Sequence, residues 1–188
     1  MIRPSAAAAA LAVLALFSTS PAPVSAKILA FDLPGMLAVC DDAVHGTIVA
    51  RRVFRIDHPI DGPELYYTVL SVNGASLRDG SEVGVEVTVL GGFVTPDEGV
   101  HNSESPREEE TAIGAEVVLF HDWTENMGGD VAGHALVAGH GGLYTVQTNR
   151  RGDRIVLGRG PGYAVPLNVS LEALRTEVAK LESARRER

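Results

Sequence analysis

The sequence predicts a mainly β protein in which about seven short strands form an antiparallel barrel or sandwich. Three observations support this prediction. Runs of β-branched and apolar residues of strand length recur between residues 47 and 157, separated by glycine-containing turns. No helical pattern lies between these runs, which argues against a parallel sheet connected by helices. A helical pattern is found only before and after these runs, at residues 33–44 and 170–186.

The amino terminus has the features of a cleavable signal peptide. Arg3 precedes an apolar stretch over residues 6–17, and Val24-Ser25-Ala26 offers small residues where a signal peptidase cuts. We expect residues 1–26 to be removed, leaving one domain over residues 27–188 that is secreted or periplasmic. The apolar stretch is shorter than the roughly 20 residues of a membrane-spanning helix, so we expect no membrane anchor after cleavage.

The charge balance is acidic, with 16 Lys and Arg residues against 24 Asp and Glu residues and a net charge of −8. Basic stripes are absent outside the carboxyl tail, and we therefore expect no binding of nucleic acid. The single cysteine, Cys40, cannot form an internal disulfide and is expected to be a buried apolar side chain.

Two helices are predicted. The first lies within residues 33–44, where Pro34 occupies a position that a first helical turn tolerates. The second covers residues 170–186, with Ser170 as its N-cap. Its apolar side chains share one face, which is typical of packing against a core: Leu171, Leu174, Val178 and Leu181.

The strands are expected at residues 47–54, 66–72, 83–90, 115–121, 135–137, 143–147 and 154–157. In the third, valine at every second position points one face toward the core. Asn149 to Asp153 supplies turn residues for a hairpin between the last two strands.

A long polar segment over residues 95–111 follows the third strand and contains Glu108, Glu109 and Glu110. Long loops in compact domains often hold binding sites. We therefore expect these three glutamates to contact a ligand, together with Trp123 in the loop that follows the fourth strand.

Four residues at strand ends and turns form a candidate metal site: His121, Asp122, His134 and His140. Imidazole and carboxylate groups are common zinc ligands. Their spacing matches no standard metal motif, and histidines at the surface or in turns are the more common explanation of such a set. No G-x-S-x-G nucleophile motif is present in the sequence.

Several strand and turn stretches over residues 36–146 carry a family resemblance: Val44-His45-Gly46-Thr47-Ile48-Val49, Tyr67-Thr68-Val69-Leu70, Leu77-Arg78-Asp79-Gly80, Val89-Leu90-Gly91-Gly92 and Gly139-His140-Gly141-Gly142-Leu143-Tyr144. Together they resemble a group of uncharacterised exported bacterial proteins that are distantly similar in shape to netrin-type modules. The resemblance implies an OB-like antiparallel barrel of six to seven strands, with a helix at each end. It implies no catalytic residues.

We therefore expect an exported, non-enzymatic binding or structural module without a cofactor, whose partner is a protein, a peptide or a saccharide. Two alternatives stay open. One is a metal-dependent enzyme that uses zinc at the four residues of the candidate metal site. The other is a peptidase inhibitor that acts through an amino terminus at Lys27, as some netrin-type modules do.

Overall fold

The computed structural model describes residues 31–187. The predicted signal peptide and Lys27 lie outside these residues. Along the chain the elements are α1 (Leu33–Val39), β1 (Asp42–His58), β2 (Gly62–Ser76), β3 (Glu82–Leu90), β4 (Gly92–Thr95), β5 (Glu98–Val100), the 3₁₀ helix η2 (Glu108–Thr111), β6 (Glu116–Thr124), β7 (Gly133–Leu136), the 3₁₀ helix η3 (Gly139–Gly142), β8 (Leu143–Thr148), β9 (Arg154–Val156), β10 (Val169–Ser170) and α2 (Leu171–Arg186).

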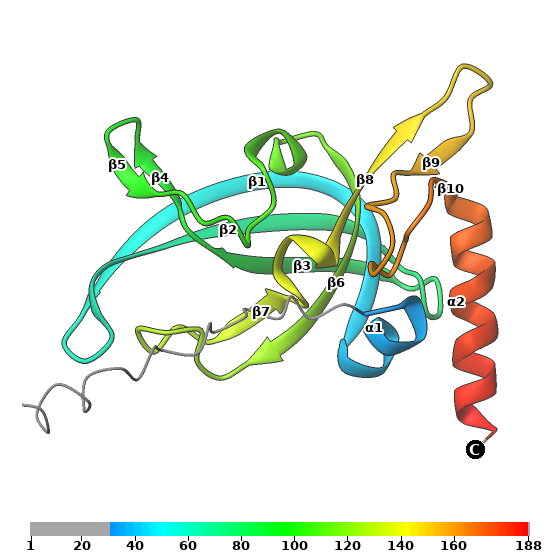
Figure 1. Ribbon diagram of the computed structural model, residues 1–188, viewed down its shortest axis with the longest axis horizontal. Coiled ribbons are helices and arrows are strands. Elements are labelled where there is room, and N and C mark those ends of the chain that lie inside the picture. The colour runs from blue at the N-terminus through cyan, green and yellow to red at the C-terminus, as the bar shows by residue number, and fades with distance from the viewer. Residues whose placement is uncertain (1–30, 188) are drawn as a thin grey trace, which may run out of the picture.

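Five strands close into a barrel in the order β1-β2-β3-β7-β6, and β6 pairs with β1 to complete the ring (Figure 1). Every neighbouring pair in the ring is antiparallel except β3 and β7, which are parallel. The structure confirms the OB-like fold class, with a helix near each end of the described chain. The predicted strand number exceeds five because β8 and β9 extend the same sheet beyond the barrel.

Strands β1 and β2 are longer than their predicted counterparts. They pair from Val44 and Ser76 to His58 and Gly62, and in Figure 1 the far half of this hairpin bends away from α2. Many side chains in the far half of β1 are exposed or half-buried and polar, so hydrophobic alternation does not mark where the strand ends.

Helix α1 is shorter than the predicted stretch over residues 33–44. Asp32 caps its first turn by accepting a hydrogen bond from the Gly35 amide at 2.8 Å. The backbone of Cys40 is already extended, and β1 begins at Asp42. The apolar residues that follow the helix therefore belong to a strand.

Two apolar clusters form the core, one inside the barrel and one between the barrel and the helices. Successive residues of β6 alternate between them, because Val117 and Leu119 point into the barrel whereas Val118 and Phe120 face the helices. The buried face of α2 joins the second cluster, and the Ser170 side chain caps this helix, both as predicted.

The turn between β2 and β3 holds both helices through Arg78. Its guanidinium forms an ion pair with Glu182 of α2 and donates to the carbonyl oxygens of Leu37 and Cys40 at 2.8 and 3.0 Å. Cys40 is a buried free cysteine, as expected, and burial raises the pKa of its thiol.

The segment over residues 95–111 has more structure than the sequence predicted. It contains β5, which pairs with β4 in a separate hairpin, and the turn η2. These elements are too short to produce a periodic apolar pattern. No helix within residues 31–187 is long and apolar enough to span a membrane.

Candidate functional site

The acidic run Glu108-Glu109-Glu110 folds into the 3₁₀ turn η2. The Glu110 carboxylate accepts a hydrogen bond from the Arg107 amide at 2.9 Å, and the Glu110 amide donates to the Arg107 carbonyl at 3.1 Å. This reciprocal cap turns the Glu110 side chain inward, leaving it 13% exposed, while that of Glu108 is 81% exposed. The three predicted ligand residues thus differ in their surroundings.

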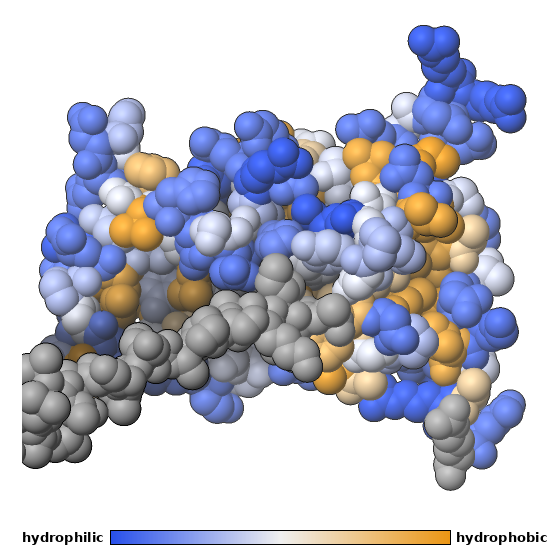
Figure 2. Space-filling view, viewed as in Figure 1, coloured by the Kyte–Doolittle hydropathy of each residue, from blue (hydrophilic) through white to orange (hydrophobic). Residues whose placement is uncertain are grey.

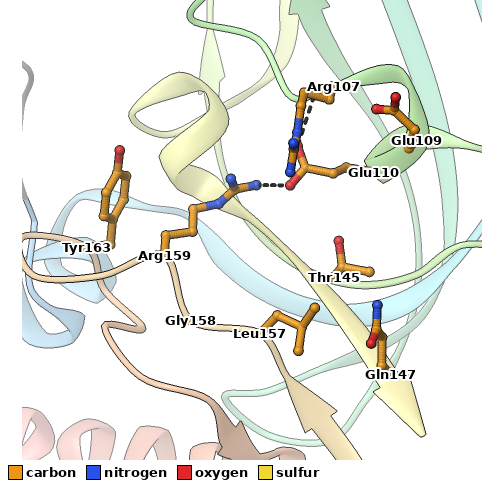
Figure 3. A pocket seen from close by; sticks show the side chains of 9 residues that line it. All are labelled: Arg107, Glu109, Glu110, Thr145, Gln147, Leu157, Gly158, Arg159 and Tyr163. Carbon is orange, nitrogen blue, oxygen red and sulfur yellow. Dashed lines mark hydrogen bonds and ion pairs between the residues drawn. The ribbon is translucent and has the colours of Figure 1, made fainter.

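Arg159 is the inward partner of Glu110. One of its terminal nitrogens lies 2.7 Å from the Glu110 carboxylate, and the guanidinium also donates to the Leu143 carbonyl at 2.8 and 2.9 Å (Figure 3). The Arg159 side chain is 17% exposed. This nearly buried pair joins η2 to the glycine-rich loop after β9, across 49 residues of sequence.

A pocket of about 480 Å³ lies between η2, β8 and the loop after β9. Figure 3 shows the Glu110 carboxylate in contact with the side chains of both Arg107 and Arg159, at 3.5 and 2.7 Å, with Thr145 and Gln147 farther down along β8. The remaining residues that line this pocket are Glu109, Leu157, Gly158 and Tyr163. Arg107 and Glu109 are exposed, so the pocket presents both a cation and an anion to solvent.

A smaller hollow of about 180 Å³ lies on the other side of η2 and shares Arg107 with the first. Arg51 lines it, 3.6 Å from Glu108, and the buried Arg51 Nε has no hydrogen-bond partner within the described residues. Phe93 is half exposed at its edge. Figure 2 shows hydrophilic residues over this part of the molecule. We refer to η2 and the two hollows as the η2 surface.

In contrast to the η2 surface, the barrel end formed by the β1–β2 turn and the β6–β7 loop (residues 125–132) is closed by contacts between its own loops. The Tyr67 hydroxyl donates to the Gly128 carbonyl at 2.8 Å, and the Gly129 amide donates to Asp61 at 2.7 Å. His58 lies 3.2 Å from both Asp61 and Asp130. We call this region the loop end. OB-type barrels commonly bind ligands between these two loops.

Gly129 lets the β6–β7 loop come this close. Its backbone has a φ of +60°, and a Cβ at this position would lie 2.9 Å from the Leu65 side chain. A larger residue would meet both backbone strain and a side-chain clash. The loop thus packs directly on β2.

Two of the four predicted metal ligands meet on neighbouring strands. The Nδ1 atoms of His121 in β6 and His134 in β7 are 3.1 Å apart. Trp123 lies within β6 and not in a loop as expected, because the strand continues to Thr124. It is opposite His134 in the strand register and half exposed, and its ring centroid lies 5.2 Å from that of His134. His121 itself is buried, and its Nε2 has no partner within the described residues.

The carboxylates of Asp41 and Asp122 lie beside this histidine pair. Asp41 accepts a hydrogen bond from the Trp123 amide at 2.8 Å and lies 4.0 Å from His134 Nδ1. Desolvation raises the pKa of Asp122, and the adjacent Asp41 raises it further. Burial lowers the pKa of His121, and His134 lowers it further.

His140 does not join the pair. It lies in η3, where its Nε2 is 3.0 Å from the Tyr163 hydroxyl. The glycine-rich turn after β7 places it there, away from the hairpin that carries His121 and His134. Within residues 31–187, no group of three His, Cys, Asp or Glu side chains is already arranged to hold a metal ion.

Sequence reasoning missed Arg107 and Arg159, and it missed Asp41 beside the histidine pair. Arg159 had one recognisable signal, since it is a long cationic side chain within the glycine-rich segment 158–162. Its contact with Glu110 depends on how distant segments pack, which local patterns do not report. Comparison of the chain with protein-family models, curated proteins and solved structures finds no match.

Proposed function

We propose that the chain is an exported binding module that holds a charged peptide segment of a partner protein at the η2 surface. The observation that carries this proposal is the pocket of about 480 Å³. The nearly buried ion pair of Glu110 and Arg159 forms its frame, and the exposed side chains of Arg107 and Glu109 form its rim. A rigid frame with a few polar groups on its rim is typical of ligand sites.

The lining favours a peptide over a neutral saccharide. Four of the nine lining residues are charged: Arg107, Glu109, Glu110 and Arg159. Tyr163 is the one aromatic residue among them, and its hydroxyl is already bonded to His140. Saccharide sites depend on exposed aromatic faces, whereas paired opposite charges suit the side chains and backbone of an extended peptide.

A hollow of about 500 Å³ between β9 and the start of α2 is a weaker candidate. Its two arginines already have partners, since Arg154 lies 3.4 Å from Glu116 and Arg175 lies 3.1 Å from His45. Binding a ligand there would first require these contacts to break. Arg107 also has a partner, Glu110 at 3.5 Å, but its side chain is 77% exposed and Glu110 keeps Arg159 at 2.7 Å, so a ligand that displaces Arg107 leaves no carboxylate unpaired.

Selection from a random dodecapeptide library displayed on phage tests the proposal. The affinity of the best selected peptide would be measured by fluorescence polarisation on the secreted chain and on three variants. We expect Arg107→Glu and Glu109→Lys each to weaken binding about tenfold or more, because each reverses a charge on the pocket rim. The matched control, Glu82→Lys, reverses an exposed charge in β3 outside the pocket and should leave the affinity within about twofold.

Two outcomes would contradict the proposal. One is that no peptide is enriched over selection on an unrelated protein. The other is that the enriched peptides bind all three variants equally well.

Export is tested separately by sequencing the amino terminus of the chain recovered from its native host. The proposal requires a start at Lys27, because the small residues of Val24-Ser25-Ala26 precede it. A mature chain that begins at Met1 would refute export by this route and would leave the peptide site untouched.

A further inference from the structure

We propose that His121 and His134, with Asp41 as a third ligand, bind a divalent transition-metal ion of the kind that prefers imidazole, such as Zn²⁺ or Ni²⁺. This site is separate from the η2 surface and does not depend on the proposed peptide binding. It also differs from the four-residue metal site expected from the sequence, because Asp41 takes the place of Asp122 and His140.

The strand register places the two imidazoles on one face of the β6–β7 hairpin. His134 pairs with Trp123 and His121 pairs with Leu136, so the two histidines are diagonal neighbours across the strands. Their Nδ1 atoms are 3.1 Å apart. Two metal–nitrogen bonds of about 2.0–2.1 Å span such a separation at an angle of roughly 100°, close to tetrahedral or octahedral geometry. The two nitrogens share a proton in a hydrogen bond, and an ion that takes the place of this proton would be bound by both imidazoles.

Asp41 supplies the third ligand from the segment between α1 and β1. Its Oδ2 atom accepts the Trp123 amide at 2.8 Å and lies 4.0 Å from His134 Nδ1, and its side chain is 50% exposed, so a small rotation brings the carboxylate to an ion held by the two imidazoles. The Asp41 amide donates to the His121 carbonyl at 2.8 Å, which fixes the backbone of Asp41 beside the hairpin. Two imidazoles and one carboxylate form a common set of ligands for transition metals.

Solvent reaches this site. The His134 side chain is 31% exposed, and the neighbouring Trp123 is 48% exposed. The carboxylates of Asp41 and Asp122 add negative charge at the entrance, which attracts a cation. An ion can therefore enter and complete its coordination with water.

Trp123 provides a reporter specific to this site. It is the only tryptophan in the chain, and its ring centroid lies 5.2 Å from that of His134. Titration of the secreted chain with NiCl₂ should quench its fluorescence in a saturable manner with one equivalent bound, because a paramagnetic ion quenches a nearby indole. ZnCl₂ should reverse the quenching by competition, and MgCl₂, which prefers oxygen ligands, should not.

Three variants locate the ligands. His134→Ala should weaken Ni²⁺ binding at least about tenfold, and Asp41→Asn should weaken it several-fold. His140→Ala is the matched control, because it removes a histidine that also follows a glycine but lies outside the proposed site. Its affinity for Ni²⁺ should stay within about twofold of that of the parent chain. Calorimetric titration with ZnCl₂ should give the same order of affinities.

The proposal is overturned if NiCl₂ does not quench Trp123 saturably, or if His134→Ala and Asp41→Asn both bind as tightly as His140→Ala. Should His134→Ala unfold, Asp41→Asn decides alone, because an asparagine at this position still accepts the Trp123 amide hydrogen bond. Unchanged Ni²⁺ affinity in Asp41→Asn then overturns the assignment of the third ligand and with it the site.

Discussion

The η2 surface and the loop end both border the barrel, yet their polar groups are used differently. At the loop end, the polar groups of one loop bind those of the other, with Asp61 holding the Gly129 amide and His58 lying between two aspartates. At the η2 surface, Glu110 pairs with Arg159 at 2.7 Å and with Arg107 at 3.5 Å, and the side chains of Arg107 and Glu109 are exposed. The polar groups of the first region therefore bind one another, whereas the second region also presents exposed charged side chains to solvent.

This difference shows that the barrel alone does not locate the site. In OB-type barrels the region between the loops corresponding to the loop end is a usual place for ligands. Here the chain's own β6–β7 loop occupies that region and packs on Tyr67 and Leu65. Side-chain chemistry, rather than topology, points to the η2 surface.

Removing the ion pair between Glu110 and Arg159 should have the largest effect on the stability of the protein. Arg159→Met removes the closer of the two arginines that pair with Glu110, whose side chain is only 13% exposed, and leaves Arg107 Nε at 3.5 Å. We expect a loss of about 2 kcal/mol in the free energy of unfolding, measured by urea denaturation, because a carboxylate that loses its closest cation is costly when little water reaches it. A loss below about 1 kcal/mol would mean that Glu110 and Arg159 are not a structural pair.

Arg107→Ala is the control for that measurement. Its side chain is 77% exposed, so the free energy of unfolding should change by no more than about 0.5 kcal/mol. The two arginines line the same pocket. A difference in stability between the two variants therefore distinguishes the nearly buried ion pair from the exposed side chain at the edge of the pocket.

Opening the loop end should have a smaller and local effect. Asp61→Ala removes the acceptor of the Gly129 amide, which we expect to cost about 1 kcal/mol in the stability of loop closure. Hydrogen exchange of the Gly129 amide should then become about fivefold faster, while amides of η2 keep their rates. Equal acceleration in both regions would show that the two are coupled.

Acid should lower the free energy of unfolding of the whole protein through His45, which lies outside both regions. This buried side chain donates to Glu116 at 2.7 Å, accepts from Arg175 at 3.1 Å and lies in the same network as Arg154. Burial lowers the pKa of His45 in the folded protein, despite the opposing effect of Glu116. Below the ordinary value of 6.5, the unfolded chain therefore binds a proton that the folded chain resists, and stability falls as the pH falls.

Urea denaturation at pH 7.5 and 5.5 measures this loss, and His45→Gln isolates its source. Glutamine does not titrate, so the variant should lose less stability between the two pH values than the parent chain. An equal loss in both proteins would assign the acid sensitivity to other groups.

The fold was predictable where burial imposes a period on the sequence. The alternating valines of β3 and the apolar face of α2 are both buried as predicted, and Ser170 caps α2 through its side chain. The far half of β1, the β4–β5 hairpin and η2 were not predictable in this way. Their residues are mainly exposed or half-buried, so backbone pairing rather than burial determines where they begin and end.

The candidate sites were predictable only in part, because their residues meet through packing between distant segments. The acidic run was identified, but which of its glutamates turns inward depends on Arg159, which is 49 residues away. His121 and His134 meet because a hairpin joins their strands, a local arrangement that the sequence allowed. His140 was expected beside them, and the η3 turn takes it to Tyr163 instead.

Mapping the contact of a selected peptide by amide chemical shifts tests most directly whether the η2 surface is the binding region. With the ¹⁵N-labelled chain and the best peptide from the phage library, the largest shift changes should fall in the segments 107–110, 145–147 and 157–159, which supply most of the residues that line the pocket. Residues of the β6–β7 loop should remain unchanged, since their polar groups already bind the chain itself. Largest changes at residues 58–67 and 125–132, with none around η2, would contradict the account and return the site to the loop end.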